Sequence, residues 1–124
     1  MQDGKHVILC VDDDPDILEC LRIVLEAEGY VMVEGSSAEE GLRVYKETHP
    51  DLVIVDLMME EVDAGTGLVK ELKALANKAP VYMLSSAGDG LADNIDYSDL
   101  GLSGVFQKPI DNDVLLSLLK AKLA

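Results

Sequence analysis

The sequence has few basic residues and few cysteines. Ten Lys and Arg residues stand against 24 Asp and Glu, giving a formal net charge of −14. Such an acidic surface disfavours direct contact with nucleic acid or with anionic membranes. The chain has two cysteines, Cys10 and Cys20, and no CxxC or Cys/His cluster, which disfavours a thiolate metal centre or a redox role. We expect two buried free thiols, with Cys20 on the inner side of the first helix.

Long apolar runs are also missing. The polar start, residues 1–5, leads directly into a strand pattern, so we expect no signal peptide, no membrane span and a cytoplasmic protein. The 124 residues suit one domain with a single core. We therefore expect one domain over residues 1–124 with no attached output domain. Basic protein surfaces and divalent cations are the partners that its charge favours.

What the sequence does contain is a series of short apolar, β-branched runs separated by helical patterns. The predicted strands are Val7–Val11, Val31–Val33, Leu52–Val55, Val81–Leu84 and Gly104–Gln107. Continuous apolar runs of this length are typical of strands buried on both faces. Strand and helix alternating five times predicts a parallel sheet with helices on both faces.

End signals delimit the first two predicted helices. Asp14 and Pro15 are suited to the N-cap and first turn of one helix, which Gly29 ends. Ser37 and Glu40 have the spacing of a capping box for the next, which ends at His49–Pro50.

The remaining helices are less uniform. An acidic loop over Glu60–Gly67 precedes a third helix, whose predicted core residues are Leu68, Val69, Leu72 and Leu75. The segment Ala87–Ser103 is rich in glycine and aspartate, so any helix there is short. The last helix runs from about Asp111 to the end of the chain, with Leu115, Leu118 and Leu119 facing inward.

Reactive side chains follow the predicted strands. They are Asp12, Asp13, Asp56, Ser85, Ser86 and Lys108. Because the carboxyl ends of parallel strands meet at one edge of the sheet, we expect these groups to gather there. Three carboxylates, two hydroxyls and an ammonium suit a divalent cation and a phosphoryl group. Asp14, by contrast, is expected to serve only as a helix cap.

The chemistry of such a cluster assigns a role to each group. Asp56 is the candidate nucleophile, since a carboxylate that attacks phosphorus forms an acyl phosphate. Asp12 and Asp13 would bind Mg²⁺, which prefers oxygen ligands. Lys108 would neutralise charge and the Ser85 hydroxyl would donate to a phosphoryl oxygen. Backbone N–H groups near Met58 and Ser86 would add donors.

The sequence resembles the receiver domain of two-component response regulators over essentially its whole length. The matching segments are Val11–Asp14, Val55–Met59, Leu84–Ala87 and Lys108–Pro109. The resemblance implies a flavodoxin-like, doubly wound five-stranded sheet in the order 2-1-3-4-5. It also implies that Asp56 is the phosphoacceptor for a histidine kinase phosphohistidine, Ser85 the switch hydroxyl and Lys108 the phosphate-binding lysine. The Mg²⁺ ligands implied are Asp12, Asp13, Asp56 and the Met58 carbonyl.

Three departures from that family pattern bear on function. Glu60 stands where the family usually has proline, so the path of the neighbouring loop is open. Val105 replaces the usual aromatic residue, and Phe106 should face the other side of its strand. We therefore expect signalling through Ser85 and Ala87–Ser103.

The third departure concerns the lifetime of the phosphoryl group. Met58 and Ala87 occupy the two positions that influence dephosphorylation in the family, and neither side chain can orient a water. We predict self-dephosphorylation over minutes or longer.

Several readings stay open at this stage. The chain could be a terminal regulator or a relay intermediate, with a sensor histidine kinase or a histidine phosphotransfer protein as donor. Its downstream partner is unknown, and a phosphorylation-dependent dimer through the final-helix face is possible by analogy.

Other classes of protein compete with this reading. One is a degenerate receiver that binds without phosphorylation; another is a haloacid-dehalogenase-type phosphatase using Asp12 and Asp14. A flavin-binding flavodoxin is disfavoured, because no Ser/Thr/Gly phosphate loop follows the first predicted strand. A calcium-binding loop that starts at Asp12 is disfavoured, because its twelfth position is Ile23 and not glutamate.

Overall fold

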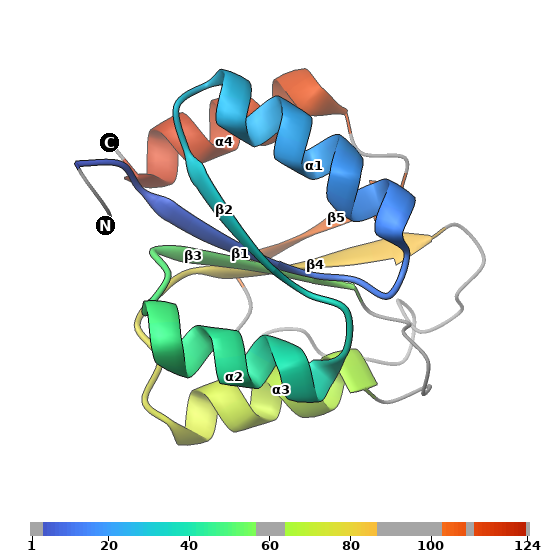
Figure 1. Cartoon of the computed structure of the whole chain (residues 1–124), viewed down its shortest axis with the longest axis vertical. Coiled ribbons are helices and arrows are strands. Elements are labelled where there is room, and N and C mark those ends of the chain that lie inside the picture. The colour runs from blue at the N-terminus through green and yellow to red at the C-terminus, as the bar shows by residue number, and fades with distance from the viewer. Residues whose placement is uncertain (1–3, 57–63, 87–102, 109–110, 124) are drawn as a thin grey trace.

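The computed structural model describes residues 4–56, 64–86, 103–108 and 111–123 (Figure 1). Within these ranges strands and helices alternate from the N-terminus up to β4. The elements are β1 (Val7–Val11), α1 (Pro15–Ala27), β2 (Val31–Gly35), α2 (Ala38–Thr48), β3 (Leu52–Asp56), α3 (Ala64–Ala74), β4 (Val81–Ser86), β5 (Gly104–Lys108) and α4 (Asn112–Leu123). All five predicted strands are confirmed, each at its predicted start.

The strands form one parallel sheet in the order β2-β1-β3-β4-β5, as the resemblance implied. Helices α1 and α4 cover one face and α2 and α3 the other (Figure 1). β1 and β3 are buried throughout because both of their faces are covered. Each face has its own apolar cluster, and the sheet separates the two.

Helix α1 begins and ends as the sequence predicts. The Asp14 carboxylate accepts the Asp16 N–H at 2.9 Å, Pro15 occupies the first turn, and Gly29 follows the helix at φ +86°. Cys20, however, lies on the exposed side of the helix, so the prediction that it is buried was wrong. The buried stripe consists of Leu18, Leu21 and Leu25. Residue 20 is two positions from Leu18, about 200° around the helix, and therefore points away from the stripe.

Helix α2 shows the predicted cap with one shift. The Ser37 hydroxyl accepts the Glu40 N–H at 3.1 Å, but the Glu40 carboxylate accepts the N–H of Ser36, at 3.0 Å, rather than that of Ser37. His49 ends the helix in a left-handed conformation, at φ +48°. The capping residues therefore act as predicted, with the reciprocal bond displaced by one residue.

Helix α3 begins at Ala64, so the predicted loop over residues 60–67 was too long at its C-terminal side. Leu68, Val69 and Leu72 are buried as expected. Leu75 is 45% exposed and does not belong to the core, because the helix has already ended at Ala74.

Helix α4 confirms the last predicted helix. Leu115 and Leu119 are fully buried, and Leu118 is partly buried against the same cluster. The predicted short helix in 87–103 falls almost wholly on residues 87–102, outside the described ranges. No helix that the structure describes combines the length and the apolarity needed to cross a bilayer.

Candidate functional site

The carboxyl edge of the sheet brings three carboxylates together. Asp12 follows β1 and Asp56 ends β3, and these strands are hydrogen-bonded neighbours in which Val11 pairs with Val55. Asp12 is 1% exposed and Asp56 4% exposed, whereas Asp13 is exposed. One carboxylate oxygen from each of the three residues lies within 4.8 Å of the other two. The predicted clustering of Asp12, Asp13 and Asp56 is therefore what the structure shows.

The turn between β1 and α1 orients the first of these carboxylates. The Asp12 N–H donates to the Gly35 carbonyl at 3.1 Å, which extends the pairing of β1 with β2 by one residue. The Asp12 carboxylate in turn accepts the Asp14 N–H at 2.9 Å. Asp14 uses its own carboxylate to cap α1, as predicted. The geometry therefore disfavours a phosphatase that would need Asp12 and Asp14 as a catalytic pair.

Three carboxylate oxygens at this spacing repel one another when ionised. A hard divalent cation suits such a set, because Mg²⁺ takes oxygen ligands and keeps several waters in its coordination shell. Two of the three carboxylates are buried, and the third is exposed. The donor chemistry of these residues therefore fits Mg²⁺.

The structure places Ser85, Ser86 and Lys108 through the backbone of their strands. Asp56 of β3 pairs with Leu84 of β4. Ser85 is therefore one residue further along β4 than the residue that lies beside Asp56. Ser85 pairs with Gln107, and Ser86 with Lys108. All three residues thus lie at the carboxyl ends of β4 and β5, on the same edge as the carboxylates. Met58 lies outside the described residues.

The two sides of β5 differ as the sequence predicts. Phe106 is 9% exposed and belongs to the cluster under α1 and α4, whereas Val105 is 38% exposed. Phe106 also contacts Tyr82 of β4, with ring centroids 5.4 Å apart. No local sequence pattern predicts this pair, because it depends on the register in which Tyr82 lies beside Gly104.

Cys10 is not a reactive group of the site. Burial raises the pKa of its thiol far above the usual range, an effect that the nearby Arg22 offsets only in part. The thiol therefore stays protonated at neutral pH, and it packs within the cluster under α1 and α4.

Residues 8–120 match the family model of the response regulator receiver domain. The chain belongs to this family. Receiver domains are parts of two-component signalling proteins, and the order of this sheet agrees with that assignment.

Curated relatives of the chain are longer proteins. The chain is 39% identical over 108 residues to the transcriptional regulatory protein GlrR of Escherichia coli, covering 87% of this chain and 24% of that protein. It is 34% identical over 123 residues to the probable transcriptional regulator ycf27 of Cyanophora paradoxa, covering 99% of this chain and 50% of the relative. The chain thus spans from 24% to 50% of the length of these relatives.

Solved structures support the same assignment. A receiver domain protein described as CheY-like, from Methanospirillum hungatei, superposes with a TM-score of 0.87 at 28% identity, covering 97% of this chain and 94% of that one. A receiver domain from Clostridium thermocellum gives 0.84 at 28% identity, covering 95% and 94%. These likenesses extend over nearly the whole of both chains.

Proposed function

We propose that this receiver is a phosphoacceptor that takes a phosphoryl group from a histidine kinase phosphohistidine onto Asp56. The observation that carries the proposal is the group of carboxylates from Asp12, Asp13 and Asp56, within 4.8 Å of one another at the carboxyl edge of the sheet. Membership of the receiver family supports it. The protein is thus a signalling protein whose only catalysis is its own phosphorylation and slow dephosphorylation.

Asp56 would be the nucleophile. Its carboxylate oxygen forms a bond to phosphorus while the N–P bond of the phosphohistidine breaks, and the imidazole leaves as a neutral ring when its other nitrogen carries a proton. Water later attacks the same phosphorus, the bond between the Asp56 oxygen and phosphorus breaks, and inorganic phosphate leaves while the carboxylate is regenerated. The position of Asp56 at the end of a buried strand supports this role, because the strand holds the nucleophile in place.

Asp12, Asp13, Asp56 and the Met58 carbonyl would hold Mg²⁺. When bound, the cation supplies positive charge at the phosphoryl oxygens. Lys108 would neutralise charge on the same group, Ser85 would donate its hydroxyl, and the Met58 and Ser86 N–H groups would donate from the backbone. Support for Ser85, Ser86 and Lys108 comes from their places at the ends of β4 and β5.

The partners proposed follow from this chemistry. A sensor histidine kinase or a histidine phosphotransfer protein would be the donor, and the readout would be a change in protein–protein contact, including a phosphorylation-dependent dimer. The net charge of −14 disfavours direct contact with DNA by this domain. Because the Met58 and Ala87 side chains cannot orient a water, we expect the phosphoryl group to persist for minutes or longer. A time course of the loss of phosphorylated protein would test this.

The test is intact-protein mass after incubation with acetyl phosphate, with and without Mg²⁺. We expect a phosphate-sized gain that requires Mg²⁺ and is abolished in Asp56→Asn. Asp14→Asn is the matched control, because Asn caps a helix as well as Asp and residue 14 stands outside the carboxylate group. A gain that persists in Asp56→Asn would contradict the assignment of the phosphoacceptor. No gain in the wild type, together with no response to BeF₃⁻, would favour a receiver that binds partners without phosphorylation.

A further inference from the structure

Two aromatic side chains lie side by side beneath the site, on β4 and β5. Tyr82 is three residues before Ser85 and Phe106 is two residues before Lys108, so each ring shares a strand with a proposed phosphoryl contact. The rings are inclined by 34°, with centroids 5.4 Å apart. Gly104 makes room for the pair, because a Cβ at that position would lie 2.9 Å from Cε1 of Tyr82.

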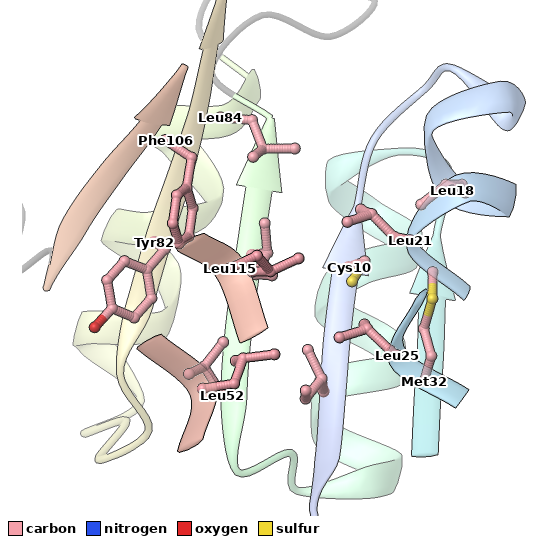
Figure 2. Packing of buried hydrophobic residues seen from close by; sticks show 13 residues of the cluster. Cys10, Leu18, Leu21, Leu25, Met32, Leu52, Tyr82, Leu84, Phe106 and Leu115 are labelled. Carbon is pink, nitrogen blue, oxygen red and sulfur yellow. The ribbon is translucent and has the colours of Figure 1, made fainter. Parts of the chain in front are cut away.

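The hydroxyl of Tyr82 is anomalous. The side chain is 2% exposed, and its oxygen has no hydrogen-bond partner in the part of the chain that the structure describes. Figure 2 shows this oxygen at the outer end of the cluster, pointing away from Cys10 and Leu21. A buried donor without a partner costs free energy that an arrangement exposing it to water would recover. The present packing of Tyr82 is therefore less stable than that of an otherwise equivalent phenylalanine.

The ring pair also belongs to the core beneath α4. Leu115 and Leu119 of this helix are fully buried in the same cluster as Tyr82 and Phe106. Figure 2 shows Leu115 among the side chains of this cluster. On its outer side α4 presents Val114, which is 53% exposed. β5 has β4 as its neighbour and lies at the edge of the described sheet, so it is less constrained than the central strands. A shift of the rings would therefore change the packing of α4, a helix whose outer side is accessible to partners.

We propose that the Tyr82–Phe106 pair couples phosphorylation to α4. This inference rests on the proposed function, in which the ends of β4 and β5 close on the phosphoryl group at Asp56. In the resting state the Tyr82 hydroxyl is buried without a partner among the described residues. In the phosphorylated state the ring turns and its hydroxyl reaches water. The movement changes the packing of Leu115 and Leu119, and α4 shifts. The pair acts through the strands and does not touch the phosphoryl group.

BeF₃⁻ mimics the phosphoryl group at a carboxylate, so its binding reports on the phosphorylated state. Tyr82→Phe removes the unfavourable hydroxyl from the resting state and so favours that state. The apparent affinity for BeF₃⁻ with Mg²⁺ should then weaken by about fivefold, the change that follows when the gap between two states widens by about 1 kcal/mol. Tyr45→Phe is the matched control, because the Tyr45 hydroxyl donates to Asn77 at 2.9 Å on the opposite face of the sheet. Its affinity should equal that of the wild type.

The experiment is a BeF₃⁻ titration at constant Mg²⁺, followed by NMR on protein labelled with 3-fluorotyrosine and ¹⁵N. In the wild type the Tyr82 fluorine signal, assigned by its absence in Tyr82→Phe, should move toward the solvent-exposed value as amide signals of residues 114–121 shift. Phe106→Leu should still bind BeF₃⁻, with smaller shifts in those α4 amides.

The outcomes separate the two proposals. If the wild type binds BeF₃⁻ but the Tyr82 signal does not move, or if Tyr82→Phe binds as tightly as the wild type, the coupling is refuted and the phosphoacceptor function stands. If the wild type does not bind BeF₃⁻ in the presence of Mg²⁺, the proposed function fails and the coupling fails with it.

Discussion

The two faces of the sheet are packed by different means. Beneath α2 the helix lies close to the sheet: a Cβ added to Gly41 would lie 2.7 Å from Cγ2 of the Val11 side chain, and one added to Gly35 would lie 2.7 Å from the Gly41 Cα. Beneath α1 and α4 the space is filled by large side chains, among them the Tyr82–Phe106 pair. The first face also has an apolar cluster of side chains, but the close approach of α2 at Gly35 and Gly41 leaves that helix few alternative positions. The second depends on side chains, whose packing can rearrange with smaller displacement of the backbone.

A pair of tyrosines shows the same contrast. Tyr45, on the α2 face, donates its hydroxyl to Asn77, whose amide also bonds both the N–H and the carbonyl of Ala79. Tyr82, on the α4 face, is more deeply buried and its hydroxyl is unpaired among the described residues. One hydroxyl therefore stabilises the loop between α3 and β4, and the other destabilises the packing around it.

The largest expected effect tests the close contact on the α2 face. Gly41→Ala should lower the free energy of unfolding by about 1–3 kcal/mol, because its methyl group would collide with Val11. Gly67→Ala, in α3, should instead raise it by about 0.5–1 kcal/mol, since no atom lies within 4 Å of the added carbon and alanine favours the helix. Urea midpoints of the two variants measure the difference. Equal effects of the same sign would mean that the α2 contact is not tight.

The next effect concerns alkaline pH on the α4 face. Burial raises the pKa of Cys10 in the folded state, whereas in the unfolded chain this thiol ionises at about pH 8.5. Its contribution to stability is therefore complete below that pH and is lost as pH rises, by up to about 1.4 kcal/mol per pH unit. Cys10→Ala should flatten the decline in unfolding free energy between about pH 8.5 and 10. Cys20→Ala, on the exposed side of α1, should leave the slope unchanged.

The smallest effect compares the two tyrosine hydroxyls directly. Tyr45→Phe should lower the free energy of unfolding by about 0.5–1.5 kcal/mol through loss of its bond to Asn77. Tyr82→Phe should raise it by about 1 kcal/mol, because the substitution removes a buried hydroxyl that has no partner in the part of the chain that the structure describes. Thermal or urea unfolding of both variants provides the measurement. A Tyr82→Phe variant less stable than the wild type would show that this hydroxyl is satisfied in solution.

The sequence by itself determined the strand runs, the helix caps and the edge at which the reactive groups meet. Those features depend on short-range physics: Asp14 caps α1 because its side chain reaches the N–H of Asp16, two residues along the chain. Because parallel strands end at one edge, the grouping of Asp12, Asp13 and Asp56 follows from the sequence pattern alone.

Only the tertiary structure decided how side chains meet between elements. The register of β4 with β5 placed Tyr82 beside Gly104 and in contact with Phe106, and no local pattern encodes that alignment. Cys20 and Leu75 are exposed because of where α1 lies on the sheet and where α3 ends. The apolar character of these two residues predicted, wrongly, that both are buried. Whether a hydroxyl finds a partner depends on every neighbour within about 3 Å, and those neighbours come from distant parts of the chain. Tyr45 and Tyr82 could therefore be told apart only in the folded protein.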